Sequence, residues 1–232
     1  MRILIATPAY GGMITTKYVH GIRESIYGSL MEKDLQLVLT TIHNESLINR
    51  ARNNFASMAI EHKYDRLLFI DGDIGWHWPD LLAIIRSNKR VVGAAYPRKH
   101  LPISLNYGLF PEQAASVRFA KDGREKHEML RKLADQLTGE LEVAHVPTGF
   151  LQIDVSVFHQ LADKVASYVD LDGSSDTLKE IRDFFPIRVV NGEIQPVDQA
   201  FSSICRENGI PVYLNTNVIL EHTGQYTFDV PR

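Results

Sequence analysis

The stretch Leu67-Leu68-Phe69-Ile70-Asp71-Gly72-Asp73 places two carboxylates at the end of four apolar residues. An unbroken apolar run is typical of a parallel strand that is covered on both faces. Two carboxylates one residue apart at a strand end can face a common cation, and magnesium and manganese prefer oxygen ligands. Asp and Gly are also ordinary turn residues, so a solvated turn is the alternative. The strand before Asp71 and the segment Ile74-Gly75-Trp76 after Asp73 favour a metal site.

Strand and helix patterns alternate on both sides of this stretch. We expect strands over residues 3–6, 35–41, 67–70 and 91–95, and helices over 16–31, after a cap at Ser46, and after Pro79. This alternation predicts a mostly parallel, doubly wound sheet. Because ligands of such sheets bind beyond the carboxyl ends of the strands, Pro8-Ala9-Tyr10 and Asp71-Gly72-Asp73 are both candidates for a binding site.

The second half of the chain has a less regular pattern. We expect a charged surface helix over residues 120–140, a polar loop over 170–176, a helix from Pro196 to near Arg206, and a short strand over 212–214. The apolar side of the first of these helices comprises Met129, Leu130, Leu133 and Leu137. The sequence contains no internal repeat, low-complexity tract or clear linker, which favours one domain.

Size and composition restrict the classes of function. With 232 residues, 44% of them hydrophobic, the chain can bury a sizeable core. A net charge of -3 does not indicate binding to nucleic acid or to an anionic membrane, although a local basic patch is still possible. Cys205 alone excludes an internal disulfide and a Cys-based zinc site, and it favours a reducing compartment. Because no run approaches ~18 apolar residues and no signal-peptide stretch is visible, we expect a soluble, cytoplasmic protein.

Two segments carry a resemblance to a known superfamily. Leu68-Phe69-Ile70-Asp71-Gly72-Asp73-Ile74 resembles the apolar strand and DxD signature of GT-A glycosyltransferases. The preceding Asn49-Arg50-Ala51-Arg52-Asn53 is similar to the Arg-rich helix before the DxD in the mannan-polymerase type, and there is some similarity to family-2-like enzymes. The resemblance implies an α/β GT-A-like single domain over residues 1–232, with a nucleotide-sugar-binding half (1–96) and an acceptor-side half (97–232).

The same resemblance implies an activity. The enzyme would move a sugar from a UDP or GDP sugar to a hydroxyl acceptor, with Mn²⁺ or Mg²⁺ neutralising the leaving diphosphate. The base and sugar of the donor, the stereochemical outcome and the oligomeric state stay open. The acceptor also stays open between a glycan, a lipid headgroup, a protein side chain and a modified nucleobase.

Roles in the nucleotide site follow from the resemblance. Thr7, Pro8 and Tyr10 would line the nucleotide pocket, with Tyr10 stacked on the base; packing of a loop aromatic is the alternative. Arg50 and Arg52 would lie near the diphosphate or the sugar, where a guanidinium forks onto phosphate oxygens. Because they are two apart on a helix, they face different directions. We expect one to be functional and the other to be a surface or salt-bridge residue.

The resemblance also implies a metal site. Asp71 and Asp73 would be its carboxylate pair, with Asp73 favoured as the direct ligand. Glu221-His222-Thr223-Gly224 resembles the late histidine segment that completes the metal site in many GT-A enzymes. A neutral imidazole suits manganese, whereas a lone histidine is more often an ordinary surface or core residue. Since metal–ligand distances are roughly 2 Å, a ligand role requires His222 to lie close to Asp73.

Two further segments resemble the acceptor side of such enzymes. Val197-Asp198-Gln199-Ala200-Phe201 resembles the start of the helix that carries the acceptor-activating carboxylate, so Asp198 would accept a proton from the acceptor hydroxyl. The family pattern has Glu-Asp, and here Pro196-Val197 precedes Asp198. An Asp stabilised by the helix dipole is therefore the alternative. Pro147-Thr148-Gly149-Phe150 looks like the loop beneath the sugar, where Gly149 allows close approach.

Two other classes of function stay open. A haloacid-dehalogenase-like phosphatase also has Asp-x-Asp after an apolar strand, but on the first strand, with Thr or Val after the second Asp. Here the motif follows the third strand and Ile74 comes next. A non-catalytic nucleotide-sugar-binding module has the same fold as an enzyme would. A dinucleotide-dependent oxidoreductase is disfavoured, because no Gly-x-Gly-x-x-Gly follows the first strand.

Overall fold

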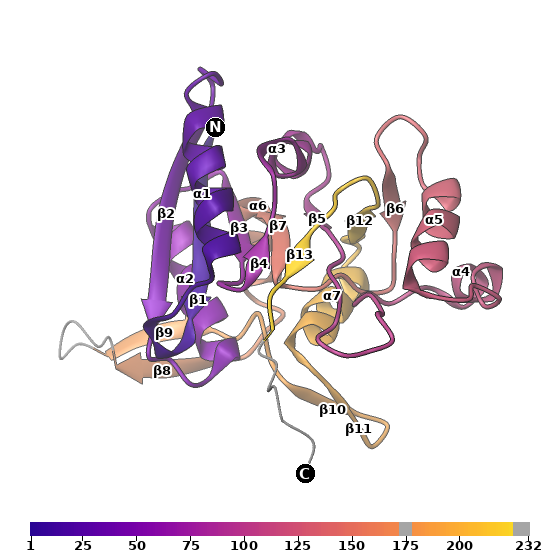
Figure 1. Cartoon of the computed structure of the whole chain (residues 1–232). Helices are drawn as coiled ribbons and strands as arrows, with labels where there is room; N and C mark the ends of the chain where they lie inside the picture. Colours follow the sequence, from indigo (N-terminus) through magenta and orange to yellow (C-terminus); the bar gives the residue numbers. More distant parts are fainter. Residues whose placement is uncertain (172–177, 225–232) are drawn as a thin grey trace, which may run out of the picture.

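A seven-stranded sheet forms the centre of the computed structural model, which describes residues 1–171 and 178–224 (Figure 1). The strand order is β2 (Gln36–His43), β1 (Arg2–Ala9), β3 (Arg66–Ile70), β7 (Phe150–Asp154), β5 (Val91–Gly93), β12 (Tyr213–Asn215) and β6 (Glu140–Glu142). Five of these strands run in one direction, and β7 and β6 run in the other. The predicted α/β fold with a mostly parallel sheet is confirmed.

Alternate residues of the central strands enter two separate cores. Leu4, Leu67 and Phe69 pack on one face of the sheet. Ile3 and Leu68 pack on the other. This is why the strand before Asp71 is apolar without a break: both of its faces are covered.

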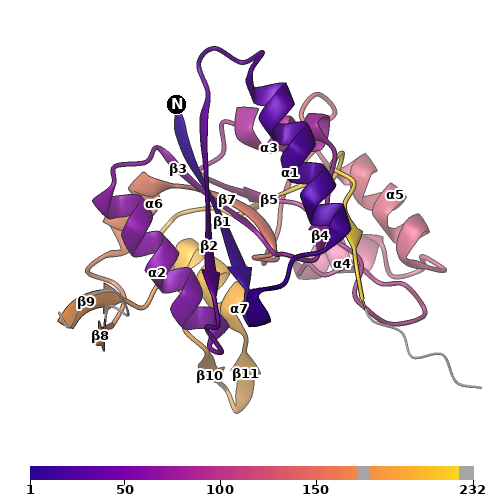
Figure 2. The same cartoon turned by 60° about the vertical axis from the view of Figure 1, so that its left-hand side comes forward.

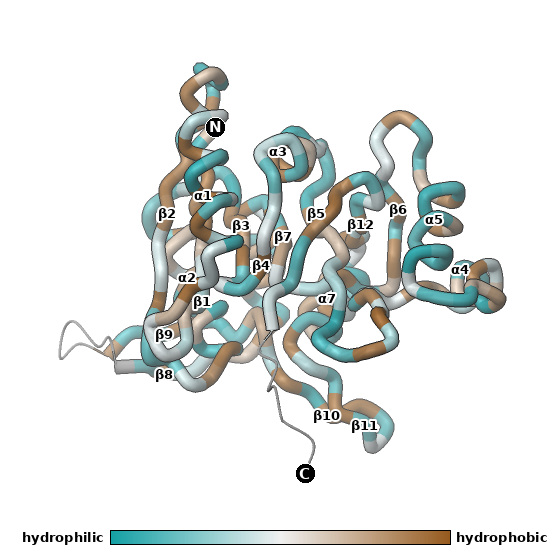
Figure 3. The backbone as a smooth tube through the Cα atoms, viewed as in Figure 1, coloured by the Kyte–Doolittle hydropathy of each residue, from teal (hydrophilic) through white to brown (hydrophobic). Residues whose placement is uncertain are grey.

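The helices cover both faces of the sheet. On one face lie α1 (Thr16–Ser29) and α3 (Trp78–Arg86), and on the other lie α2 (Ile48–Glu61), α6 (Val155–Leu161) and α7 (Val197–Glu207). Figure 2 shows α1 and α2 on opposite sides of β1 and β2. The short helices α4 (Pro111–Ser116) and α5 (Gly123–Leu133) lie beside β6, and Figure 3 shows α5 as mostly hydrophilic.

Three short two-stranded ribbons complete the fold. They are β4 (Ile74–Gly75) with β13 (Glu221–His222), β8 (Ser167–Leu171) with β9 (Leu178–Arg182), and β10 (Arg188–Val190) with β11 (Glu193–Gln195). The first ribbon matters most for function. It is antiparallel and pairs His222 with Ile74, the residue that follows Asp73.

Several element boundaries differ from the sequence predictions. Strand β1 continues to Ala9 and is followed by the 3-10 turn η1 (Tyr10–Gly12), and β5 ends at Gly93. Ser46 does not cap α2: the cap residue is Leu47, and it makes no side-chain cap bond. Instead, the carboxylate of Glu45 accepts the Leu47 amide at 2.9 Å just before the helix.

The charged helix of the second half is shorter than its apolar pattern predicts. Helix α5 ends at Leu133, because Asp135 turns the chain by accepting the amides of Leu137 and Thr138 at 3.0 and 2.8 Å. Leu137 is therefore 94% exposed instead of lying on the apolar side of the helix. The predicted polar loop over 170–176 begins inside β8, and residues 172–177 lie outside the described part of the chain.

Within residues 1–171 and 178–224, no helix is long and apolar enough to cross a membrane.

Candidate functional site

The turn after β3 presents the two carboxylates. The Asp71 amide donates to the Gly149 carbonyl at 2.9 Å, and the Ile74 amide closes the turn onto the Asp71 carbonyl at 3.0 Å. The Gly72 carbonyl accepts the amide of Thr15, just before α1, at 2.8 Å. Three separate parts of the chain thus hold the backbone of this turn, and the two carboxylates leave it in different directions.

Asp71 is held by a buried arginine. Arg52 is 2% exposed, donates from Nη2 to Asp71 Oδ1 at 2.9 Å, and lies 4.9 Å from the Phe69 ring centroid. Its Nε and Nη1 have no hydrogen-bond partner among the described residues. A buried charge needs a partner, so Arg52 is tied to Asp71. Arg50 faces away, with its Nε 2.5 Å from Glu45 Oε2, as the spacing of the two arginines predicts.

Asp73 meets two basic side chains. Its Oδ2 accepts a short hydrogen bond from the Lys99 ammonium and lies 3.4 Å from His222 Nε2. Burial raises the pKa of Asp73, but the hydrogen bonds from His222 and Lys99 outweigh this effect and lower the pKa to about 2. The carboxylate is therefore ionised at neutral pH.

The position of His222 is set by the last strand of the described chain. Because β13 pairs with β4, the Thr223 amide donates to the Asp73 carbonyl at 2.9 Å and the His222 ring lies beside Asp73. His222 Nδ1 is 2.6 Å from the Pro97 carbonyl, which can only accept, so Nδ1 carries a proton. Nε2 then donates to Asp73 Oδ2 only when the ring is protonated, and in the neutral ring Nε2 has a lone pair instead of a proton. The requirement that His222 lie close to Asp73 is met.

Tyr96 connects these groups. Its ring packs edge-on against His222, with centroids 5.0 Å apart and an interplanar angle of 74°. A Cβ on Gly149 would lie 2.4 Å from the Tyr96 hydroxyl and 2.7 Å from Asp71 Oδ2, so a side chain at position 149 does not fit without movement. Burial, with the Asp71 charge adding to it, raises the pKa of Tyr96 well above its usual range. Its hydroxyl is therefore a permanent donor.

A cavity of about 750 Å³ opens in front of the two carboxylates. It is lined by Pro8, Tyr10, Met13, Ile14, Thr15, Glu45, Ser46, Ile48, Asp71, Gly72, Asp73, Lys99, Thr223 and Gly224. Pro8 and Tyr10 lie where the sequence predicts, and Tyr10 is 73% exposed. Thr7 does not line the cavity: it is fully buried, and its Oγ1 is 2.6 Å from the Tyr18 hydroxyl.

Asp198 lies apart from this lining. It is half-buried in the first turn of α7, and its Oδ1 accepts the Gln199 amide at 2.9 Å. Its negative charge also contributes to the raised pKa of Tyr96. Asp198 is therefore within electrostatic reach of the Tyr96 hydroxyl but is not part of the cavity lining.

Tyr96 and Lys99 are the site residues that the sequence analysis missed. Both lie in the segment after β5, which ends at Gly93. The rule that ligands bind beyond the carboxyl ends of parallel strands applies to this strand as it does to β1 and β3. The basic run Arg98-Lys99-His100 after a buried strand is the signal that points to this segment.

The side chains around Asp73 supply some, but not all, of the ligands that a divalent cation needs. Among the described residues, no three His, Cys, Asp or Glu side chains gather into a metal site. Asp73 Oδ2 and His222 Nε2 are 3.4 Å apart, close enough to bind one ion at ligand distances of roughly 2 Å. Magnesium commonly takes one or two carboxylates and completes its shell with water and substrate phosphates. The pair fits such an ion once the Lys99 ammonium moves aside.

Comparisons with known proteins bear on the fold. No protein-family model matches the chain, and no curated protein matches it in sequence. A197 from STIV matches with a TM-score of 0.53 and 16% identity, over 97% of this chain and 87% of that one. GalNAc-T7, solved with UDP, GalNAc and Mn²⁺, matches with a TM-score of 0.52 and 10% identity, over 96% of this chain.

The chain spans 44% of the GalNAc-T7 structure. A structure of S. aureus TarS 1–349 with UDP-GlcNAc has a TM-score of 0.45 and 13% identity, over 98% of this chain and 60% of that one. At these identities the matches with A197 and GalNAc-T7 establish the fold alone, which is GT-A-like.

Proposed function

We propose that this chain, with its GT-A-like fold, is a metal-dependent glycosyltransferase that moves a sugar from a UDP or GDP sugar to a hydroxyl acceptor. The observation that carries the proposal is the contact between Asp73, which lines a cavity of about 750 Å³, and His222, which is distant in sequence. Ligand pockets commonly measure roughly 300–1,000 Å³, so the cavity suits a nucleotide sugar. The presence of UDP, GalNAc and Mn²⁺ in GalNAc-T7, which has a similar fold, supports it.

The lining of the cavity suggests how the donor is held. Pro8 and the exposed ring of Tyr10 bind the nucleoside, with the ring stacked on the base. Asp71 accepts hydrogen bonds from sugar hydroxyls while Arg52 keeps its carboxylate in place. Gly149 has no room for a side chain, which allows its backbone to lie against the Asp71 and Tyr96 oxygens beside the bound sugar.

Asp73 and His222 would hold the divalent cation, and Nδ1 of His222 is already oriented by the Pro97 carbonyl. When bound, the ion supplies Lewis-acid stabilisation of charge on the departing diphosphate. Asp198 accepts the proton of the acceptor hydroxyl in this proposal, and the protonated Tyr96 hydroxyl orients a substrate oxygen between Asp71 and Asp198.

The phosphatase alternative fits the site less well. It requires Asp71 as a free nucleophile, whereas Asp71 Oδ1 is bound by the buried Arg52. The GT-A-like fold also argues against it. A non-catalytic nucleotide-sugar-binding module would have the same cavity and the same metal pair. Such a module would bind the nucleotide sugar but would not transfer the sugar to an acceptor.

A thermal-shift panel tests the proposal. UDP and GDP sugars should raise the melting temperature of the wild-type chain in the presence of Mn²⁺, because binding to the native state stabilises it by about 2.7 kcal/mol at 100 times the Kd. Asp73→Asn should abolish the Mn²⁺-dependent shift. Asp34→Asn is the matched control, since Asp34 is an ion-paired carboxylate that bonds Arg86 outside the cavity. A full shift of the Asp73 variant in excess chelator would overturn the proposed metal site.

A further inference from the structure

Each of the three carboxylates that line the cavity has a basic partner. The pairs are Glu45 with Arg50, Asp71 with Arg52, and Asp73 with Lys99. The guanidinium groups of Arg50 and Arg52 are not part of the cavity lining. Among the described residues that line the cavity, Lys99 is the one with a cationic side chain.

Of the three basic partners, Lys99 is the one whose side chain can leave its carboxylate. Arg52 is 2% exposed, whereas the Lys99 side chain is 42% exposed. An ammonium on a four-carbon stem offers three donors without a fixed fork, so it exchanges partners more readily than a guanidinium does. The backbone around it is held in place: Pro97 and Leu105 form an antiparallel bridge, and the Arg98 amide donates to the Ser104 carbonyl at 2.7 Å. Only the side chain needs to move.

The contact between Lys99 and Asp73 has a direct consequence for the cation. The ammonium occupies Asp73 Oδ2, the same oxygen that lies 3.4 Å from His222 Nε2 and that an ion bound by this pair would need. Ammonium and ion therefore compete for one atom. A nucleoside diphosphate brings further negative charge into a cavity lined by three carboxylates, so a displaced ammonium finds a phosphate partner there.

We propose that Lys99 is a phosphate-binding residue that shares Asp73 with the divalent cation. The ion displaces the ammonium from Asp73, and the diphosphate accepts the ammonium that the ion displaces. Each ligand thereby removes an obstacle to the other, so cation and nucleoside diphosphate bind with positive coupling, which must be equal in both directions. The inference rests on the proposed nucleotide-sugar site and assigns to it the residue that links its two ligands.

Lys99→Met tests the inference, because it keeps the length of the stem and removes the charge. Two constants are measured on the full-length chain: the Kd of Mn²⁺ alone, by electron paramagnetic resonance, and the Kd of UDP and of GDP in saturating Mn²⁺, by calorimetry. The variant should bind Mn²⁺ alone several-fold more tightly, because the competing ammonium is gone. It should bind the nucleotide roughly tenfold more weakly, the usual effect of losing a charge-assisted hydrogen bond.

Two further variants control the experiment. Lys17→Met removes a comparable exposed lysine, 53% exposed and paired with Glu221 at 2.9 Å, which lies outside the cavity lining. Both constants should equal those of the wild type. Lys99→Arg keeps the charge and should restore most of the nucleotide affinity. A melting temperature recorded without ligands verifies that each variant is folded.

The outcomes separate this inference from the proposed function. If wild-type chain binds neither UDP nor GDP with Mn²⁺, the proposed function fails and the role of Lys99 fails with it. If the wild type binds and Lys99→Met leaves the nucleotide Kd unchanged, only the role of Lys99 is refuted. Weakening of both constants together also refutes it, because a competitor of the cation cannot support cation binding.

Discussion

Asp71 and Asp73 are separated by one glycine, yet their surroundings give them different chemistry. Asp71 is bound by a guanidinium that has no room to leave. Asp73 meets an imidazole and an exposed ammonium, and the ammonium can move when a ligand binds. The geometry therefore favours Asp73 as the cation ligand and leaves Asp71 for sugar hydroxyls. The spacing of the two residues alone does not distinguish these roles.

At the residue scale, Asp198 separates catalysis from binding. Asp198→Asn keeps the shape of the side chain and removes its charge, so transfer should fall by roughly 10²–10⁴-fold, the usual contribution of a general base. Donor affinity should be unchanged, because Asp198 lies outside the cavity lining. Initial rates of transfer and calorimetry of donor binding measure the two effects.

The outcomes for Asp198→Asn are distinct. A rise in the acceptor KM along with the rate loss would indicate a hydrogen bond to the acceptor in a retaining enzyme. Transfer at the parental rate would leave Asp198 as a helix-start residue whose carboxylate holds the Gln199 amide. If the wild-type chain binds nucleotide sugars and transfers to no acceptor of any of the four classes, the binding module is the better description.

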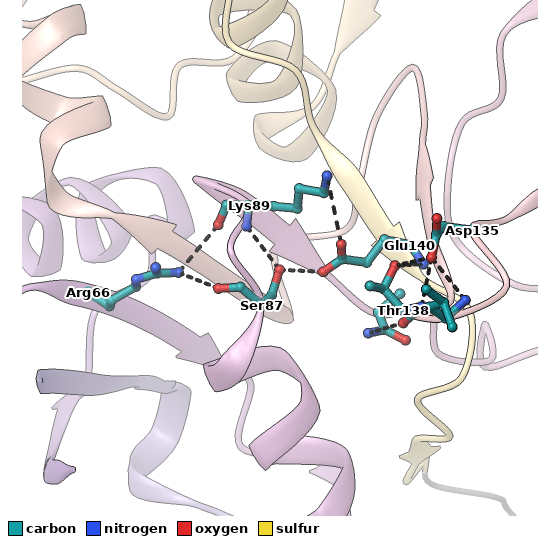
Figure 4. A network of polar contacts seen from close by, with 8 residues as sticks. Arg66, Ser87, Lys89, Asp135, Thr138 and Glu140 are labelled. Atoms are coloured by element: carbon teal, nitrogen blue, oxygen red, sulfur yellow. Dashed lines mark hydrogen bonds and ion pairs between the residues drawn. The ribbon is translucent and has the colours of Figure 1, made fainter. Parts of the chain in front are cut away.

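At the scale of elements, a polar network links the segment before β5 to β3 and β6 (Figure 4). Ser87 and Lys89 precede β5, whereas Tyr96 and Lys99 follow it. The buried carboxylate of Glu140, at the start of β6, accepts the Ser87 hydroxyl and lies 3.9 Å from the Lys89 ammonium. Arg66 donates to the Ser87 and Lys89 carbonyls at 3.3 Å. The network joins β3, β5 and β6 through side chains.

Glu140→Gln should lower the free energy of unfolding by about 1–3 kcal/mol, because it removes the acceptor charge from a buried set of hydrogen bonds. Glu142→Gln, an exposed carboxylate on the same strand, should change it by less than about 0.5 kcal/mol. Denaturant unfolding gives both values. Nucleotide affinity should be the same in both variants, and a loss of affinity in Glu140→Gln would contradict the separation of this network from the cavity.

At the scale of the whole molecule, the site joins parts that are distant in sequence. The Asp71-Gly72-Asp73 turn comes from the first half of the chain, and His222 reaches it through a ribbon of two residues on each strand, β4 and β13. Because these two parts of the chain meet only in the folded protein, the proposed metal site would form only in the native fold. A cation bound there would hold the two parts of the chain together.

His222→Ala should therefore affect cation binding more than the fold. The Kd of Mn²⁺ should rise by roughly tenfold or more, since losing even a supporting group of a metal site costs 10–100-fold. Without metal, stability should fall by no more than about 1.5 kcal/mol, the net value of one hydrogen bond. His77→Ala is the matched control, because His77 also pairs with a carboxylate, Glu24, at 3.2 Å. An unchanged Mn²⁺ Kd in His222→Ala would contradict the ligand role.

The α/β architecture and the position of the two carboxylates after β3 were predictable because both depend on local patterns. An unbroken apolar run such as residues 67–70 requires cover on both faces, and the carboxylates after it must then lie at the carboxyl edge of the sheet. The separation of Arg50 and Arg52 onto different sides of α2 likewise follows from the pitch of a helix.

Other features depend on contacts between distant segments, which no local pattern records. The antiparallel strand β7 lies between β3 and β5, pairs with both through its backbone and sends its apolar side chains into the cores on both faces, and its direction leaves no mark in the sequence. Thr7 turns inward because Tyr18 supplies a buried partner for its hydroxyl. Lys99 meets Asp73 because the loop after β5 folds back over the β3 turn. A side chain's partner is chosen by packing in three dimensions, and periodicity along the chain specifies only the face on which that side chain lies.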